Sequence, residues 1–274
     1  MNQTGQSAAG HGGVRLVQGI AILGAAAVFS KLLGTLQKIP LQNIAGDEAY
    51  GIYSAVYPLY VLILVLATAG FPTAVAKLVS EQAAAGNIYE ARRIYRLAAL
   101  ILTFTGLVAF LLMYSGAGVI AGWIGSTQAE QAIRSVSFAL LLVPLMASSR
   151  GYFQGMQNMV PTAVSQSVEQ TIRVAVMITL LLILTSREAS SGCIAAGATF
   201  GSVAGACAGL LVMILYDVRD RAQWKSDEQQ VRRQSSAPAS QLVRRIMKYA
   251  MPVALGSIVV PLLSMIDSFT LPRL

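Results

Sequence analysis

The chain has 274 residues, of which 55% are hydrophobic and only 12% are charged. The charged fraction is about half that of a typical soluble domain, and the mean hydropathy is +0.62. A soluble protein of this length needs far more polar surface to enclose one core. The composition therefore excludes a soluble globular domain and indicates an integral membrane protein.

Seven long apolar blocks follow one another along the chain, and each is long enough to cross a hydrocarbon core about 30 Å thick. We therefore predict an all-α, polytopic membrane protein with a six-helix N-terminal lobe and a seventh transmembrane helix. The blocks are Val14–Leu36, Tyr53–Val79, Leu97–Ile124, Ala132–Phe153, Pro161–Thr185, Gly192–Tyr216 and Ile246–Leu271.

The 20 lysines and arginines, which give a net charge of +8, are unevenly placed between the blocks. The N-terminus and the even-numbered loops hold 14 of them, the other side holds 4, and Lys31 and Arg173 lie within blocks. The positive-inside rule then predicts a multi-pass protein of the bacterial inner membrane with its N-terminus in the cytoplasm. The basic segment Asp217–Lys248 is better explained as a topology signal facing membrane lipids than as an arm for nucleic acid, so no nucleic-acid partner is expected.

The predicted organisation has four parts. Residues 1–13 form a polar cytoplasmic leader, residues 14–216 the six-helix lobe, residues 217–245 a basic cytoplasmic linker, and residues 246–274 the first helix of a second lobe. No second six-helix lobe follows the first in this sequence. We therefore expect either a fragment of a longer protein or one half of a dimer.

The loops between the blocks also carry predictions. The segments 37–52, 125–131 and 186–191 are expected to be short external loops. The segment 80–96 places tyrosines and an isoleucine among arginines, which predicts a helix lying in the headgroup region.

No pattern for covalent chemistry or metal binding is present in the sequence. His11 has no ligand cluster around it, and no Walker loop or catalytic triad pattern occurs. Cys193 and Cys207 are 14 residues apart on one predicted helix, hence roughly 21 Å apart and unable to bridge each other. We expect a protein that is not an enzyme and that uses no cofactor and no metal.

Charged residues inside the apolar blocks are the main candidates for function, because such charges are costly in a membrane. In the fifth block Thr162, Gln166, Glu169 and Arg173 recur at i, i+4, i+7 and i+11, one stripe on one helix face. Arg173 would lie about 18 Å along that helix, near the midplane. The stripe either faces a water-filled cavity or consists of an i,i+4 ion pair that only joins helices.

Three further charges are candidates for the wall of a substrate cavity. Lys31 near the outer end of the first block suits a phosphate-bearing substrate. Lys38 follows on the same face and is equally explained as a lysine reaching the interface on its own stem. Asp267 lies in the proline-containing seventh block and is either a cavity residue or a cap near the outer end.

Three other patterns concern packing. Gly197, Gly201, Gly205 and Gly209 form a small-residue face that permits close approach between helices. Tyr50, Tyr53, Tyr57 and Tyr60 recur near the outer interface and mostly indicate an aromatic belt. The sequence Gly70-Phe71-Pro72 breaks the second block and is a plausible hinge.

Three segments resemble a known family. The segment from Arg150 to Arg173 closely resembles the fourth-to-fifth-helix junction of the polysaccharide-biosynthesis exporters, most of all their stage V sporulation protein B and lipid II flippase group. Ser30–Pro40 resembles their first-helix motif, and Ala69–Lys77 resembles their second-helix motif.

The resemblance implies a member of the multidrug/oligosaccharidyl-lipid/polysaccharide exporter superfamily, with two six-helix lobes facing each other. It further implies alternating-access transport of undecaprenyl-pyrophosphate-linked precursors of peptidoglycan or polysaccharide, in the cell wall or in sporulation. First-helix cations line the cavity in such proteins, and Lys31 and Lys38 match those positions, with lysine in place of the more usual arginine at the first. Members are about twice as long as this chain, which therefore looks truncated.

Two other functions are open. A cation-coupled multidrug antiporter of the same superfamily would need an acidic relay, whereas the candidate set of Lys31, Lys38, Gln166, Glu169, Arg173 and Asp267 is slightly cationic. A non-transporting membrane scaffold for wall-synthesis enzymes would leave the charged stripe purely structural. The expected partners are a lipid-linked glycan, membrane lipids, and a second transporter lobe or wall-synthesis enzymes.

Overall fold

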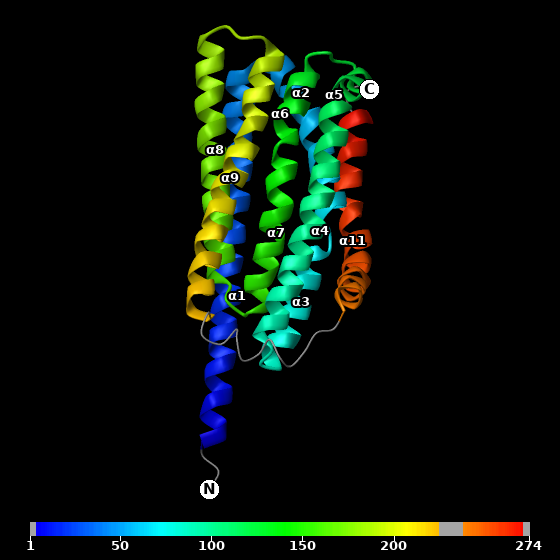
Figure 1. Cartoon of the computed structure of the whole chain (residues 1–274). Coiled ribbons are helices and arrows are strands. Elements are labelled where there is room, and N and C mark those ends of the chain that lie inside the picture. The colour runs from blue at the N-terminus through cyan, green and yellow to red at the C-terminus, as the bar shows by residue number, and fades with distance from the viewer. Residues whose placement is uncertain (1–3, 225–237, 271–274) are drawn as a thin grey trace.

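The computed structural model describes residues 4–224 and 238–270, with side chains described for 17–221 and 238–263. These ranges are built of helices joined by short turns, and Figure 1 shows most of the helices running lengthwise in one bundle. The helices are α1 (Thr4–Leu36), α2 (Lys38–Thr68), α3 (Phe71–Ala84), α4 (Ile88–Ser115), α5 (Ala117–Ile124), α6 (Ala129–Ser137), α7 (Ala139–Gly155), α8 (Val160–Ser186), α9 (Ser191–Trp224) and α11 (Ala239–Thr270).

Six segments of the described chain are long and apolar enough to cross a membrane. They are Val17–Ala84, Ile88–Ser115, Ala129–Gly155, Val160–Ser186, Ser191–Arg221 and Ala239–Leu263. The first has 68 residues, about three times the length that one crossing needs. Figure 1 shows α1 and α2 as separate, adjacent helices, so this segment contains the first two predicted blocks. The predicted all-α, polytopic membrane fold is confirmed.

The predicted external loop 37–52 is wrong. A turn at Gln37 separates α1 from α2, and α2 is already helical from Lys38, with a break at Gly46 where φ is 79° and ψ is 162°. Leu41 is fully buried and anchors these first turns. The polar residues that indicated a loop lie on exposed faces of a helix, which hydropathy alone does not distinguish from a loop.

The predicted headgroup helix at 80–96 is also wrong. α3 continues to Ala84, a tight turn contains Gly86 at a φ of 76°, and α4 starts at Ile88. Ile94 is fully buried in the core between α3, α4 and α7. Arg92 is buried as well and pairs with Asp220 of α9 at 2.9 Å. The segment is therefore the base of a helical hairpin, in which the arginines are partly used for packing.

The charged segment 217–248 is shorter as a connection than predicted. α9 extends through Trp224, and α11 begins at Ala239. The central part of the predicted linker, residues 225–237, lies outside the described residues, as do the first three residues of the predicted leader.

The break between α2 and α3 falls at Gly70, as the Gly-Phe-Pro sequence predicts. Gly70 has a φ of 77°, and Pro72 lies at the start of α3. A break within a membrane segment frees backbone carbonyls, which need partners where no water is present. Thr105 of α4 donates a hydrogen bond of 3.1 Å to the carbonyl of Ala67 and so satisfies one of them.

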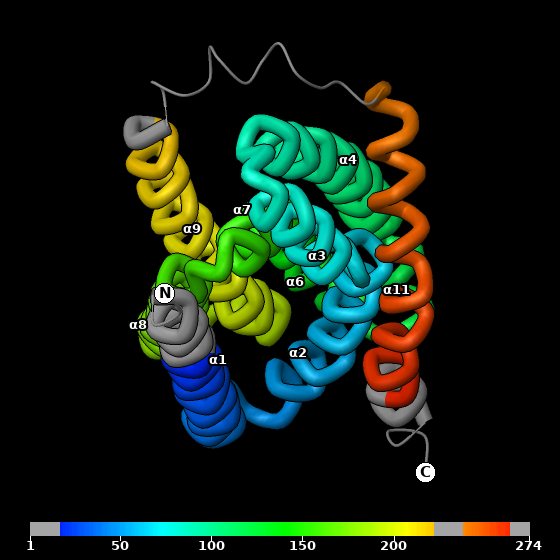
Figure 2. Tube along the Cα trace, turned by 90° about the horizontal axis from the view of Figure 1, so that it is seen from below, coloured from blue at the N-terminus to red at the C-terminus, as the bar shows by residue number. Residues whose placement is uncertain are grey.

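α11 packs against this break. A Cβ added to Gly70 would overlap the backbone carbonyl of Ala250, so the two helices meet backbone to backbone. The ammonium group of Lys77 lies 3.8 Å from the ring centroid of Tyr249 at the same junction. Figure 2 shows α11 at one edge of the bundle and α8 at the other.

Candidate functional site

The polar stripe of α8 faces the bundle interior. Pro161 lies in the first turn of α8, a position where the missing N–H costs nothing and the fixed φ favours a helix. Thr162, Ser165 and Glu169 are buried, each at 9% exposure or less. The helix therefore turns its polar face away from lipid, as a polar stripe at this depth requires.

The centre of the site is one carboxylate between two arginines. Glu169 accepts a hydrogen bond of 2.7 Å from Arg173, one turn later on α8, and one of 2.8 Å from Arg150 on α7. The three side chains retain only 15%, 18% and 12% exposure for Arg173, Arg150 and Glu169. The predicted i,i+4 pair is confirmed, and it is part of a larger cluster that joins two helices.

The hydroxyl of Ser165 connects the cluster to α9. Arg150 donates to this hydroxyl through Nε at 3.3 Å and through a terminal nitrogen at 2.8 Å. The hydroxyl in turn donates to the carbonyl of Gly209 at 2.9 Å. The planar guanidinium group of Arg150 uses two of its nitrogens as donors in fixed directions. A lysine at position 150 would not reproduce this arrangement.

Three tyrosines of α2 lie next to the cluster. Arg173 donates to the hydroxyl of Tyr57 at 3.4 Å. Tyr57 stacks on Tyr53 with ring centroids 5.3 Å apart and lies 6.0 Å from the ring of Tyr60. Tyr53 and Tyr60 are buried, so the predicted aromatic belt is wrong at these positions. The tyrosines repeat at helical spacing because they line the inner face of α2.

The glycine face of α9 allows the cluster to form. A Cβ at Gly205 would lie 2.6 Å from the carbonyl oxygen of Glu169, and a Cβ at Gly201 would lie 2.7 Å from that of Arg173. Both are closer than side chains approach in real structures. The predicted close packing of this face is confirmed, and its partner is the charged stretch of α8.

The other predicted site residues differ in their exposure. Gln166 is half-buried on α8, whereas Lys31 and Lys38 are exposed on α1 and at the start of α2. Lys31 lies three residues before Gly34 on α1. At Gly34 this helix comes close to α8, because an added Cβ would lie 3.3 Å from Nε2 of Gln170. The backbone of Asp267 belongs to α11, but its side chain lies outside the described residues. A role for these residues in a cavity stays a prediction.

Sequence reasoning missed two members of the cluster, Arg150 and Tyr57. Arg150 lies near the end of an apolar block, so it was counted among the charges that set topology. Its signal is the short connection to α8, residues 156–159, which folds the end of α7 back along the start of α8. Tyr57 was assigned to the membrane interface because its helical partner could not be known.

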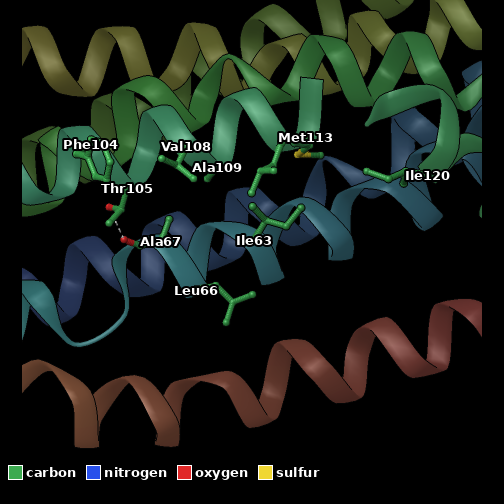
Figure 3. Close-up of a pocket in the computed structure, with 10 residues that line it drawn as sticks. Ile63, Leu66, Ala67, Phe104, Thr105, Val108, Ala109, Met113 and Ile120 are labelled. Carbon is green, nitrogen blue, oxygen red and sulfur yellow. Dashed lines mark hydrogen bonds between the residues drawn. The ribbon is translucent and has the colours of Figure 1, made fainter. Parts of the chain in front are cut away.

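A cavity of about 420 Å³ lies apart from this cluster and shares no lining residue with it. Ten residues of α2, α4 and α5 line it, and Figure 3 shows them between α2 and α4, with Leu66 directed toward α11. Its walls are apolar, including Phe104, Val108 and Ile120, and none of its lining residues is charged. A polar substrate would not be recognised there.

Metal-binding groups are not assembled in the described chain. Within 4–224 and 238–270, no three His, Cys, Asp or Glu side chains of the searched residues gather as ligands. Cys193 and Cys207 are both free.

Long apolar helices packed around a buried ion cluster define a multi-pass α-helical membrane protein. The fold matches that of a MATE protein solved in complex with MaD3S, with a TM-score of 0.64 at 13% identity, over 88% of this chain and 52% of the other. Residues 16–274 match the family model described as polysaccharide biosynthesis protein. The chain belongs to this family, which confirms the resemblance noted in its motifs.

Curated relatives from Bacillus subtilis (strain 168) agree with the family. The chain is 31% identical over 254 residues to the uncharacterized membrane protein YabM, covering 93% of this chain and 46% of the relative. It is 30% identical over 266 residues to the lipid II flippase MurJ, covering 93% and 49%. Stage V sporulation protein B is 30% identical over 206 residues, covering 73% and 38%. The chain thus spans about half the length of these relatives at most.

Proposed function

We propose that this chain is the N-terminal part of a flippase that moves undecaprenyl-pyrophosphate-linked precursors of peptidoglycan or polysaccharide across the bacterial inner membrane. The observation that carries the proposal is the family match over 16–274, together with 30% identity to a lipid II flippase over nearly the whole chain. The buried ion cluster is consistent with a lobe whose polar groups face inward. Transport follows alternating access, and the protein performs no covalent chemistry.

In this proposal the chain is divided as its helices suggest. Residues 14–216 form the first lobe, residues 217–245 the cytoplasmic linker, and residues 246–274 the first helix of the second lobe. Covering 49% of the lipid II flippase relative supports this division, because one lobe and one helix account for about half of such a protein. The substrate site lies between the lobes, where each conformational state exposes it to one side of the membrane.

Substrate recognition in this proposal depends on cations of the first helix and its continuation. Lys31 and Lys38 are exposed on the lobe and free to contact a pyrophosphate group as charge-assisted donors. Asp267 contributes from the seventh helix. Gln166, Glu169 and Arg173 contribute from within the first lobe. Contacts of Glu169 with Arg150 and of Arg173 with Tyr57 hold α2, α7 and α8 together behind the cavity wall.

The test is a flipping assay on the full-length protein in proteoliposomes with a fluorescent lipid-linked glycan. Lys31→Ala removes one charged donor to the pyrophosphate and is expected to lower the flipping rate about tenfold, the effect of losing one charge-assisted hydrogen bond. Arg187→Ala is the matched control, because Arg187 is an exposed cation in the turn between α8 and α9.

The outcomes separate the proposed functions. If the wild type flips the glycan and Lys31→Ala flips it at the same rate, the flippase proposal stands but Lys31 is not part of the substrate site. Absence of glycan flipping by the intact wild-type protein would contradict the proposal and leave the antiporter and the scaffold, which an assay of drug efflux in the same vesicles would separate.

A further inference from the structure

The buried cluster of Arg150, Glu169 and Arg173 has a net charge of +1. Arg150 and Arg173 are both cations, and Glu169 is the one carboxylate that pairs with them among the described residues. Both arginines keep less than a fifth of their side-chain surface. Because an uncompensated charge is strongly unfavourable in a water-poor interior, the surplus requires a counter-charge.

Two hydrogen-bond donors at the same end of the cluster have no partner within the described chain. Nε of Arg173 is buried and unbonded, and so is the hydroxyl of Tyr60, a residue that is only 1% exposed. At the other end, Arg150 donates to Ser165 and to Glu169. The unmet donors and the surplus charge therefore occur together on the side of Arg173.

The tyrosines of α2 bring these groups near each other. Arg173 donates to the Tyr57 hydroxyl at 3.4 Å, and the Tyr57 and Tyr60 rings lie 6.0 Å apart. Two buried donors beside a cation are the elements of an anion site.

We propose that a small inorganic anion of the size of chloride binds between α2 and α8, held by Arg173 and the Tyr60 hydroxyl beside Tyr57. The anion neutralises the surplus charge and satisfies both unpaired donors. A single water molecule would satisfy the donors but not the charge, which is why an anion is favoured. This site lies inside the first lobe and does not depend on the proposed flippase activity.

The test compares thermal unfolding of the purified chain in sodium chloride and in sodium gluconate at equal ionic strength. Gluconate is too large for the site, so wild-type protein is expected to unfold at a temperature about 3 °C higher in chloride, the shift for an anion at roughly ten times its Kd. In Tyr60→Phe the shift should fall to less than half, because one donor to the anion is gone. Tyr114→Phe, which removes a hydroxyl in the last turn of α4 and outside the site, should keep the full shift.

The Tyr60→Phe variant is expected to fold, since the hydroxyl it removes makes no hydrogen bond in the described chain. A crystal soaked in bromide provides a second measurement, in which an anomalous peak should lie within hydrogen-bond distance of Arg173. Equal unfolding temperatures of the wild type in the two salts, a full shift retained by Tyr60→Phe, or an empty site in bromide would each overturn the proposal. A chloride effect of the same size in both variants would indicate general screening instead.

Discussion

Glu169 is shared by arginines from two different helices, and its two oxygens are used separately. Oε1 accepts from Arg173 and Oε2 from Arg150. A buried charge without a partner strongly destabilises a fold. Removing the charge of Glu169 should therefore destabilise the protein, because both arginines lose the carboxylate that pairs with them. The same substitution at an exposed ion pair should cost little.

Replacing Glu169 by glutamine tests this at the scale of one residue. Glu169→Gln keeps the size but removes the carboxylate that pairs with both buried guanidinium groups, and we expect a loss of about 3–5 kcal/mol in stability. The measurement is the thermal unfolding midpoint in detergent. The control is Glu130→Gln, which breaks the pair with Arg134 whose side chains are 50% and 35% exposed, and should cost under about 1 kcal/mol. Equal effects of the two variants would contradict the role of the cluster.

The sequence predicted the Glu169–Arg173 pair because helix periodicity fixes which residues are neighbours within one helix. The same reasoning cannot find Arg150 or Tyr57, because these come from other helices and only tertiary packing brings them close. Arg150 was also ambiguous in kind, since a cation near a helix end is usually explained by membrane topology. The positions of Lys31, Lys38 and Asp267 relative to a cavity need the second half of the protein.

Between elements, the contact of α8 with α9 depends on residues without side chains. Gly201 and Gly205 face the backbone carbonyls of Arg173 and Glu169, so the two helices approach until their backbones nearly touch. Such small-residue contacts stabilise helix pairs within membranes, where there is no hydrophobic driving force between helices. The glycine face was readable from the sequence because residues at i and i+4 lie on the same side of a helix.

Adding one methyl group to this face tests the contact. Gly205→Ala places a Cβ 2.6 Å from the Glu169 carbonyl, which forces α9 away from α8 and should cost about 1–3 kcal/mol. Gly24→Ala is the control, since nothing lies within 4 Å of its added Cβ and alanine is the better helix former. The thermal unfolding midpoint should fall for the first variant and stay or rise for the second. A neutral Gly205→Ala would mean that α8 and α9 can separate freely.

Other elements were harder to predict from the sequence. Local polarity predicts a loop at the start of α2 and a surface helix at the hairpin of α3 and α4, because polar residues usually mark exposed segments. Leu41 and Ile94 show the error, since both are fully buried within those segments. Burial of a single apolar residue among polar ones depends on which neighbouring helix passes by, and periodicity alone does not contain that information.

For the whole molecule, the uneven placement of lysine and arginine predicts the direction of insertion. Figure 1 places the N-terminal end of α1, the hairpin between α3 and α4, and the start of α11 toward the same end of the bundle. The turn between α8 and α9 lies at the opposite end. The positive-inside rule assigns the first of these ends to the cytoplasm.

Reporter fusions check this orientation. A fluorescent protein joined after Gly86 should fluoresce, and alkaline phosphatase joined after Glu188 should be active, because the latter enzyme folds only outside the cytoplasm, where disulfides form. Phosphatase fused after Gly86 and the fluorescent protein fused after Glu188 are the paired controls, and both should be inactive. The inverse pattern would contradict the predicted topology.

Position 70 is subject to two restrictions that no single alternative residue meets. Its positive φ of 77° already disfavours every residue that has a Cβ, and the carbonyl of Ala250 occupies the place where that Cβ would be. Asparagine, which often tolerates such a φ, is excluded by the second restriction. The residue at this position is therefore a diagnostic for the path of α11. A related chain with any other amino acid there must hold that helix elsewhere, and a chain with glycine remains compatible with the arrangement in Figure 2.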